Sequence, residues 1–290
     1  MFKKIAVGIS GGVDSAVAAL LLKKANYQVQ GVFMRNWDSN YEAGFCTDEK
    51  DFEDATVVCH VRLLQPADKH KDQTFFLSQV QQFSLRKCMF PIANLLKSEV
   101  RTIARKEGLL QVASKRDSTG ICFIGKRRFQ DFIGDFIQTR EGFFIDIDSG
   151  HKVGEHSGIH KWTVGQRCCL SNFTQAYFIF KKDLSTNNIY VVPGTKHPAL
   201  WNDLCITETP HWICKEPSDL TNNGVLNCSF RFQHTKPLVP CRVLKNYEGL
   251  TILLETNLRA LTEGQFGVLY NDSECLGSAK IKHVCHNLVY

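Results

Sequence analysis

The stretch "AVGISGGVDSAVAALLL", residues 6–22, joins an apolar run to a helical pattern through a turn rich in glycine and serine. Lys3 to Gly8 has the pattern of a buried strand, and Ser15 to Lys24 that of a helix with one apolar face. A second strand is predicted for Gln28 to Met34. Because strand–helix–strand order is typical of parallel sheets, the first domain is predicted to be α/β.

The turn itself, "GISGGVDS" at residues 8–15, predicts an anion-binding site. Backbone N–H groups at a helix start, together with the positive end of the helix dipole, attract an anion such as phosphate. Ser10 and Ser15 add hydroxyl donors, and Asp14 is expected either to hold a magnesium ion or to cap the helix. The turn lacks the patterns of a Walker loop and of a dinucleotide fold. The alternative is an ordinary glycine turn with Asp14 as its N-cap.

Composition narrows the class of protein. The chain has 290 residues, of which 43% are hydrophobic, and a formal net charge of +6. This length predicts two or three domains, and the apolar runs are too short to cross a membrane. The mild positive charge fits either a polyanionic partner or an ordinary solvated surface. Twelve cysteines without a C-x-x-C pair argue against a zinc ribbon, and most are expected to be small buried hydrophobes.

The remaining chain changes character along its length. Helices are expected at Thr47–Val61, around Phe75–Phe83 and at Lys97–Lys106, with few strands to extend the first sheet. Alternating strands begin with "GFFIDIDSG", residues 142–150. From Leu200 to Tyr290 the pattern is one of short strands between Asn, Gly and Pro turns, which predicts a small β-barrel.

The loop "SGGVDS" resembles the pyrophosphate-binding loop of the ATP pyrophosphatases, which activate a carbonyl oxygen by adenylation. Further stretches resemble one group of these enzymes, the tRNA-specific 2-thiouridylases, and most closely the mitochondrial form. These stretches are "GVFMRNWD", "DKHKDQTFFLSQV", "STGICFIGKRRF", "GIHKWTVGQR", "RFQHTKPLVPC" and "EGQFGVLY". The resemblance implies ATP-dependent sulfuration of C2 of the wobble uridine in tRNAs for Lys, Glu and Gln. The sulfur would come as a persulfide from a cysteine desulfurase relay.

The same resemblance implies the fold and the surroundings of the protein. It implies a shortened ATP-pyrophosphatase domain of the adenine nucleotide alpha hydrolase type at residues 1–128, with an incomplete parallel sheet. A small central domain at 129–198 and a C-terminal β-barrel domain at 199–290 would follow. ATP with Mg²⁺, a tRNA anticodon as partner, a mitochondrial location and no membrane contact are also implied, although the sequence opens without a clear transit peptide.

Site residues follow from matching positions. Cys122 lies in "KRDSTGICFIGKRR", where five Lys and Arg residues favour a thiolate or persulfide anion. The resemblance assigns the persulfide to Cys122, although the residues alone also fit a buried structural thiol. It assigns nucleotide binding to Gly8, Ser10, Gly11, Gly12, Val13, Asp14, Ser15 and Met34. It assigns tRNA contacts to Lys71, Asp72, Gln73, Arg231, Phe232 and Gln265, and no metal-ligating residues.

Several of these residues have plainer interpretations. Lys71 to Gln73 also fit a helix start with solvated charges, and Gln265 also fits a turn. Arg231 and Phe232 equally fit a cross-strand core pair. "GIHKWTVGQR", residues 158–167, is predicted to be a tight turn that supports the central domain without chemistry of its own. His156 and His160 lie four apart but lack a strong third ligand, so a metal pair is not expected.

Two stretches of the family pattern have no counterpart here. One is the segment with "NPDxxCN", which supplies a nucleophilic cysteine, and the other resembles "ATGHYAR"; the junction lies near His60 to Leu63. The role of the missing cysteine would then have to be taken by another cysteine or by an external reductant. The candidate cysteines are Cys46, Cys59 and Cys88. Because this segment is missing, one alternative is a protein that binds tRNA without catalytic turnover. Another adenylating ligase is the third alternative, against which the "STGICFIGKRR" stretch speaks.

Overall fold

The computed structural model describes residues 4–8, 12–32, 61–115, 129–170, 173–221 and 224–285. The chain forms two compact units, one of residues 1–123 with 273–276 and the other of residues 124–272 with 277–290. Among the described residues, no helix is both long enough and apolar enough to cross a membrane.

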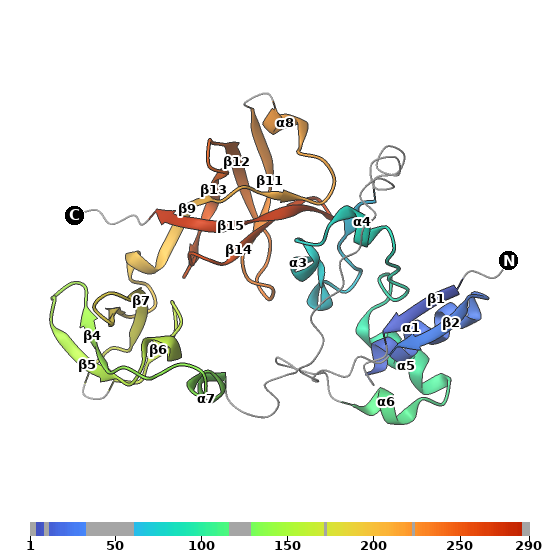
Figure 1. Ribbon diagram of the computed structural model, residues 1–290, viewed down its shortest axis with the longest axis horizontal. Coiled ribbons are helices and arrows are strands. Elements are labelled where there is room, and N and C mark those ends of the chain that lie inside the picture. Colours follow the sequence, from blue (N-terminus) through green and yellow to red (C-terminus); the bar gives the residue numbers. More distant parts are fainter. Residues whose placement is uncertain are drawn as a thin grey trace. The chain divides into compact units, whose positions relative to one another are not determined.

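The first unit opens with the predicted strand, helix and strand (Figure 1). Strands β1 and β2 pair in parallel, from Lys4 opposite Gln28 to Gly8 opposite Val32, which confirms the α/β start. The predicted burial of the first strand is wrong except at Val7, because the other residues of β1 are exposed or half-buried. The helix begins two residues earlier than predicted, directly after Gly12. The elements of this unit are β1 (Lys4–Gly8), α1 (Val13–Lys24), β2 (Gln28–Val32), β3 (Leu63–Leu64), η1 (Lys69–Lys71), α3 (Thr74–Leu77), α4 (Gln82–Leu85), α5 (Lys97–Lys106) and α6 (Leu110–Ser114).

A small apolar core holds α1 against α5 and α6. Val13 and Val17 lie one helical turn apart on α1 and are buried against Val100 and Ala104, which have the same spacing on α5. Side chains four residues apart share one face of a helix, so the two stripes meet along their length. Burying each valine contributes about 1.5–3 kcal/mol to folding.

The segment after β2 differs from its prediction in two ways. The helix expected around Phe75–Phe83 is split into α3 and α4, because Gln81 adopts an extended backbone (φ −65°, ψ 146°) that ends one helical run before the next begins. An unpredicted two-residue strand, β3, pairs Leu63 with Cys275 within the same unit. Residues 47–60 of the helix predicted at residues 47–61 lie outside the described residues, and Val61 is not helical.

The second unit begins with a five-stranded sheet in the order β5-β4-β8-β7-β6. Its first strand shows the predicted alternation, since Gly142, Phe144 and Asp146 are buried while the residues between them are less so. The elements are α7 (Phe129–Gly134), β4 (Gly142–Asp146), β5 (Lys152–His156), η2 (Ile159–Lys161), β6 (Arg167–Cys168), β7 (Tyr177–Asp183) and β8 (Asn188–Pro193).

The rest of this unit, together with residues 274–276 at the start of β15, is the predicted barrel. Its strands run in the order β15-β14-β11-β12-β13-β9, and pairing of β15 with β9 closes the ring. Closure removes the exposed edges that an open sheet would present. The elements are η3 (Pro198–Leu200), β9 (Trp201–Thr207), β10 (His211–Trp212), α8 (Ser218–Thr221), β11 (Val225–Arg231), β12 (Val239–Lys245), β13 (Leu250–Arg259), β14 (Phe266–Asn271) and β15 (Glu274–Cys285).

A close contact joins the five-stranded sheet to the barrel within this unit. Gly165 has φ +82°, and a Cβ placed on it would lie 2.4 Å from the Cβ of Ala260. The guanidinium of Arg259 donates to the Gly165 carbonyl at 2.8 Å and lies 4.9 Å from the centre of the Phe178 ring. The turn predicted within residues 158–167 therefore has a packing role, because only glycine combines this backbone with this approach.

Candidate functional site

The first group of site residues surrounds the start of α1. Gly12 is the N-cap residue and has no side-chain capping bond, so Asp14 does not cap the helix as the sequence allowed. Asp14 lies in the first turn instead, where the helix dipole favours a carboxylate. The Ser15 hydroxyl donates to the Gly12 carbonyl at 3.1 Å. A Cβ placed on Gly8 would meet no described atom within 4 Å.

Asp14 is paired with a residue that the sequence did not indicate. Lys97, the first residue of α5, donates from Nζ to the two carboxylate oxygens of Asp14 at 2.5 and 2.6 Å. The Lys97 side chain is 16% exposed, whereas that of Asp14 is 52% exposed. A resident ammonium group therefore lies beside the predicted phosphate-binding turn. Because 83 residues separate the partners, no local pattern signals the pair.

The same lysine is held at its backbone by Asp68. The Lys97 N–H donates to Oδ2 of Asp68 at 3.0 Å, and the His70 N–H donates to Oδ1 at 3.0 Å. The backbone hydrogen bond from Lys97 is the main cause that lowers the pKa of Asp68 below its ordinary value. Asp68 thus links the start of α5 to η1, the segment that contains Lys71.

The three residues predicted at the tRNA contact differ in exposure. Lys71 and Gln73 are exposed, but Asp72 between them is fully buried. Oδ1 of Asp72 accepts from the Thr74 N–H at 2.9 Å and the Thr74 hydroxyl at 2.6 Å, and Oδ2 accepts from Nε2 of Gln65 at 2.7 Å. Asp72 therefore fixes the turn that presents its two neighbours.

A second group of predicted residues lies in the barrel, and two of them are interior. Arg231 is 6% exposed and Phe232 is 4% exposed. The Phe232 ring stacks on Phe230 at 6.5 Å, and the Arg231 guanidinium lies 5.3 Å from the Tyr270 ring centre. This burial favours the core interpretation that the sequence left open beside the tRNA contact.

Gln265 approaches the same end of the barrel. Strand β11 ends at Arg231, which pairs with Val268 near the start of β14, and Gln265 directly precedes that strand. The Gln265 carbonyl accepts from the Ile281 N–H at 2.8 Å, which fixes its backbone. Its side-chain Oε1 is buried, and within the described part of the chain it has no hydrogen-bond partner.

Four predicted site residues lie outside the described residues: Ser10, Gly11, Met34 and Cys122. The basic residues 116–128 around Cys122 lie there too, and so do Cys46 and Cys59. Cys88 is exposed, and its thiol donates to the Ser84 carbonyl at 3.3 Å.

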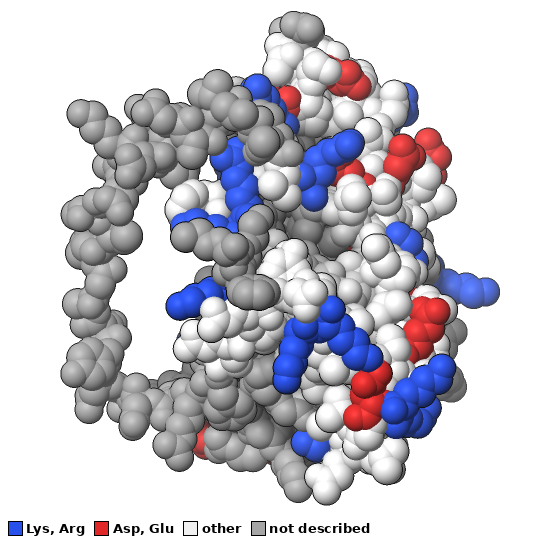
Figure 2. Space-filling view, turned by 90° about the vertical axis from the view of Figure 1, so that its right-hand side faces the viewer, with Lys and Arg blue, Asp and Glu red and all other residues white. Residues whose placement is uncertain are grey.

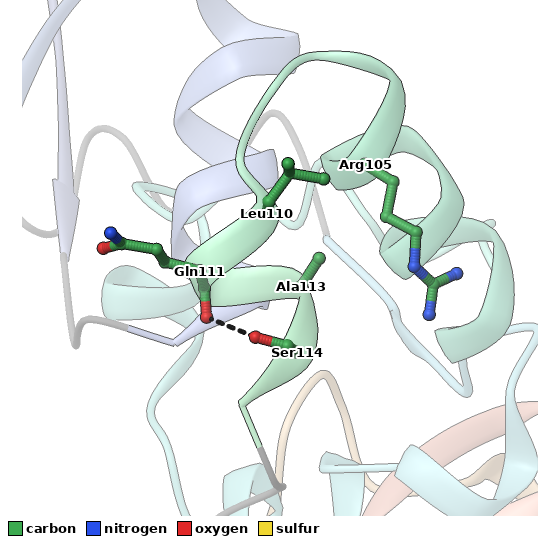
Figure 3. Close-up of a pocket in the computed structure, with 5 residues that line it drawn as sticks. All are labelled: Arg105, Leu110, Gln111, Ala113 and Ser114. Atoms are coloured by element: carbon green, nitrogen blue, oxygen red, sulfur yellow. Dashed lines mark hydrogen bonds between the residues drawn. The ribbon is translucent and has the colours of Figure 1, made fainter.

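Two surface hollows in the described part of the chain are lined by other residues. One hollow, of about 420 Å³, lies in the first unit (Figure 3). In its wall the Ser114 hydroxyl donates a hydrogen bond to the Gln111 carbonyl at 3.0 Å, and the other lining residues are Arg105, Leu110 and Ala113. Another of about 980 Å³ lies beside β4 and β7 in the second unit. Neither is lined by a predicted site residue.

The two histidines of the sequence pattern differ: His156 of β5 has structural partners, whereas Nε2 of His160 in η2 is buried without a hydrogen-bond partner among the described residues. His156 is buried; its Nε2 lies 3.1 Å from the Asn187 carbonyl, and its Nδ1 accepts from the Gly158 N–H at 3.2 Å. Burial lowers the pKa of His156, so its neutral form is favoured. In the described ranges no three His, Cys, Asp or Glu side chains gather as metal ligands would.

Comparison with family models divides the chain in three. The model described as tRNA methyl transferase HUP domain matches residues 3–62 and 60–126. The tRNA methyl transferase PRC-barrel domain matches residues 130–193, and the aminomethyltransferase beta-barrel domain matches residues 202–281. The first match is broken at residues 60–62, where the sequence pattern places the junction.

Curated relatives match nearly the whole chain. Mitochondrial tRNA-specific 2-thiouridylase 1 of Drosophila melanogaster is 39% identical over 366 aligned positions, covering 97% of this chain and 94% of that protein. The Homo sapiens protein of the same name is 35% identical over 379 positions, covering 96% and 90%. tRNA-specific 2-thiouridylase MnmA of Alkaliphilus oremlandii is 32% identical, covering 97% of each chain. Because these alignments are longer than the chain's 290 residues, they include positions with no counterpart here.

Proposed function

Because this chain belongs to the tRNA-specific 2-thiouridylase family, we propose that it replaces O2 of the wobble uridine by sulfur in tRNAs for Lys, Glu and Gln. In the proposed reaction the uridine O2 attacks the α-phosphorus of ATP and pyrophosphate leaves. The terminal sulfur of a Cys122 persulfide then attacks C2, and AMP leaves with the oxygen. A second thiol, from another cysteine or an external reductant, attacks the Cys122 sulfur, breaks the remaining S–S bond and releases the 2-thiouridine, which leaves a disulfide between the second thiol and Cys122. The family match over almost the whole chain carries this proposal.

The residues at the start of α1 fit a polyphosphate. The turn offers backbone N–H groups at a helix start, and Lys97 adds a cation that Asp14 holds in place. The Ser15 hydroxyl donates to the Gly12 carbonyl and so holds the turn, and we propose Ser15 for the nucleotide site from the family pattern. Gly8, Gly12 and Val13 complete the described part of this proposed site, and Ser10, Gly11 and Met34 are proposed from the family pattern. Both Asp14 oxygens already accept from Lys97, so we propose Mg²⁺ as a companion of the nucleotide phosphates only.

For tRNA, we propose Lys71 and Gln73 as direct contacts, because both are exposed on a turn held by Asp72. At the barrel we propose Gln265 as the base-contacting side chain from the family pattern; its Oε1 is buried without a partner among the described residues, so the side chain would have to rotate outward to accept from a base. Arg231 and Phe232 would support that end of the barrel from inside. A mitochondrial location is proposed from the mitochondrial relatives.

The test is mass spectrometry of wobble uridines after incubation of the purified chain with tRNA, ATP, magnesium and a persulfide donor, with and without a thiol reductant. We expect 2-thiouridine to form, and Cys122→Ser to abolish it while pyrophosphate release continues. The double variant Asp14→Ala/Ser15→Ala should lose pyrophosphate release as well, because adenylation needs the loop. Thiolation by Cys122→Ser would overturn the assigned role of Cys122.

One observation favours a second candidate function. The family-model match breaks at residues 60–62, and the segment that carries the family's second cysteine has no counterpart. A chain that binds tRNA without turnover would give tRNA binding but no 2-thiouridine in the same assay. A chain that neither binds nor thiolates tRNA would contradict both candidates.

A further inference from the structure

Two thiols face one another across adjacent strands of the barrel. Strands β11 and β12 are antiparallel, and their register places Cys228 directly opposite Cys241. The two Sγ atoms are 3.6 Å apart. Opposed residues of antiparallel strands have Cα atoms about 4.5–5.5 Å apart, within the span that a disulfide bridges. A covalent bond of about 2.05 Å therefore requires the sulfurs to approach by about 1.5 Å, which side-chain rotation can supply.

This pairing is unusual among the cysteines of the chain. Nine cysteines lie in the described residues and all are free. Cys205 faces Val284 rather than Cys285 across β9 and β15, and Cys275 faces Leu63. Within the described ranges, Cys228 and Cys241 are thus the only two cysteines that are register partners.

The two thiols differ in access. Cys241 is 2% exposed, whereas Cys228 is partly exposed. The hydrogen bond with Cys228, and then burial, raise the pKa of Cys241 well above its usual range. Cys241 therefore keeps its proton, and Cys228 is the thiol that a reagent in solvent reaches first.

We propose that Cys228 and Cys241 form a reversible disulfide in the folded protein, with a small-molecule disulfide such as oxidised glutathione as the oxidant. The Cys228 thiolate attacks one sulfur of the reagent, whose S–S bond breaks and releases one thiolate. Cys241 transfers its proton to the first released thiolate as its sulfur attacks the Cys228 sulfur, which releases the second thiolate. Two protein thiols are oxidised and one reagent disulfide is reduced to two thiols.

The experiment treats the full-length chain with oxidised glutathione, blocks the remaining thiols by alkylation, and maps peptides without reduction. We expect a linked peptide pair containing Cys228 and Cys241, which dithiothreitol removes. Oxidation should also raise the melting temperature, because a cross-link restricts the unfolded chain. Cys285→Ser is the matched control and should keep both the link and the shift, whereas Cys228→Ser should lose both.

Two results would overturn the proposal. One is alkylation of both Cys228 and Cys241 after oxidation of a chain whose circular dichroism is unchanged. The other is a stable glutathione adduct on Cys228, or a link to a different cysteine. The peptide map of the unsubstituted chain decides the matter even where Cys228→Ser fails to fold, and Cys228→Ala then serves as the second variant.

Discussion

Asp72 and Gln73 are neighbours in the sequence with opposite surroundings. The carboxylate of Asp72 is buried and accepts hydrogen bonds from Thr74 and Gln65, while the amide of Gln73 is exposed to solvent. A buried acceptor that satisfies three donors stabilises a turn, whereas an exposed amide is available to a partner. Within one short segment, Asp72 therefore contributes to stability, and Gln73 is the residue available for recognition.

Replacement of Asp72 by Ala should lower the free energy of unfolding by about 1–3 kcal/mol, because its buried donors lose their acceptor. Urea unfolding measures the loss. Gln73→Ala is the matched control; it should leave stability nearly unchanged and weaken tRNA binding. Equal stability of the two variants would contradict the structural role of Asp72.

Asp68 predicts a pH dependence. Its pKa is lowered in the folded chain, mainly by the backbone N–H of Lys97, so the unfolded chain binds more protons in acid. The stabilisation is present above the ordinary carboxylate pKa and is lost as the pH falls below about 4. The urea midpoint at about pH 5 and about pH 3 should fall more for the unsubstituted chain than for Asp68→Asn. Identical falls would show that this carboxylate contributes nothing.

At the scale of elements, two ion pairs connect α1 to the neighbourhood of α5. Lys97 and Asp14 pair at the start of both helices, beside the glycine turn. Lys24 and Glu107 pair at the opposite ends of the same two helices. Because both pairs join the same elements, they form a natural comparison between a charge at the proposed site and a charge away from it.

Lys97→Ala should weaken ATP binding about tenfold, because it removes a charge-assisted hydrogen-bond donor beside the proposed phosphate site. Lys24→Ala should leave ATP affinity unchanged, although it breaks a pair between the same two helices. Titration with a fluorescent ATP analogue measures both affinities. Equal weakening in the two variants would show that Lys97 acts only by holding the helices together.

The elements also show where sequence patterns are informative. Helix α5 has the predicted bounds, Lys97–Lys106, because its apolar residues recur with helical spacing. The split between α3 and α4 was not predicted, since it depends on the backbone of a single residue, Gln81. The Asp14–Lys97 pair and the burial of Asp72 were not predicted either, because both arise from tertiary contacts.

At the scale of the whole molecule, the net charge is +6, and Lys and Arg are prominent on the face drawn in Figure 2. A cationic surface binds tRNA partly by releasing counterions, so affinity falls with salt. Raising the salt from about 50 to about 200 mM should weaken tRNA binding about tenfold or more. A filter-binding titration at the two concentrations checks this, and an affinity independent of salt would contradict phosphate contacts.

The three-part order of the chain was predicted from its changing pattern, and the structure and family models agree with an α/β start and a C-terminal barrel. The alternation of residue types along strands such as β4 allowed the strands of the second unit to be predicted. The pairing of Cys228 with Cys241 was not predicted, because strand register depends on the turns between strands rather than on composition.

The contact between Gly165 and Ala260 bears on how relatives can exchange parts. The central sheet and the barrel meet where Gly165, which has no side chain, makes room for the side chain of Ala260. A chimera that takes either module alone from a relative must therefore bring a glycine and a small residue that still match. If the central sheet and the barrel are transferred together, the residues at their contact already match. A chimera should therefore exchange the two modules as one piece.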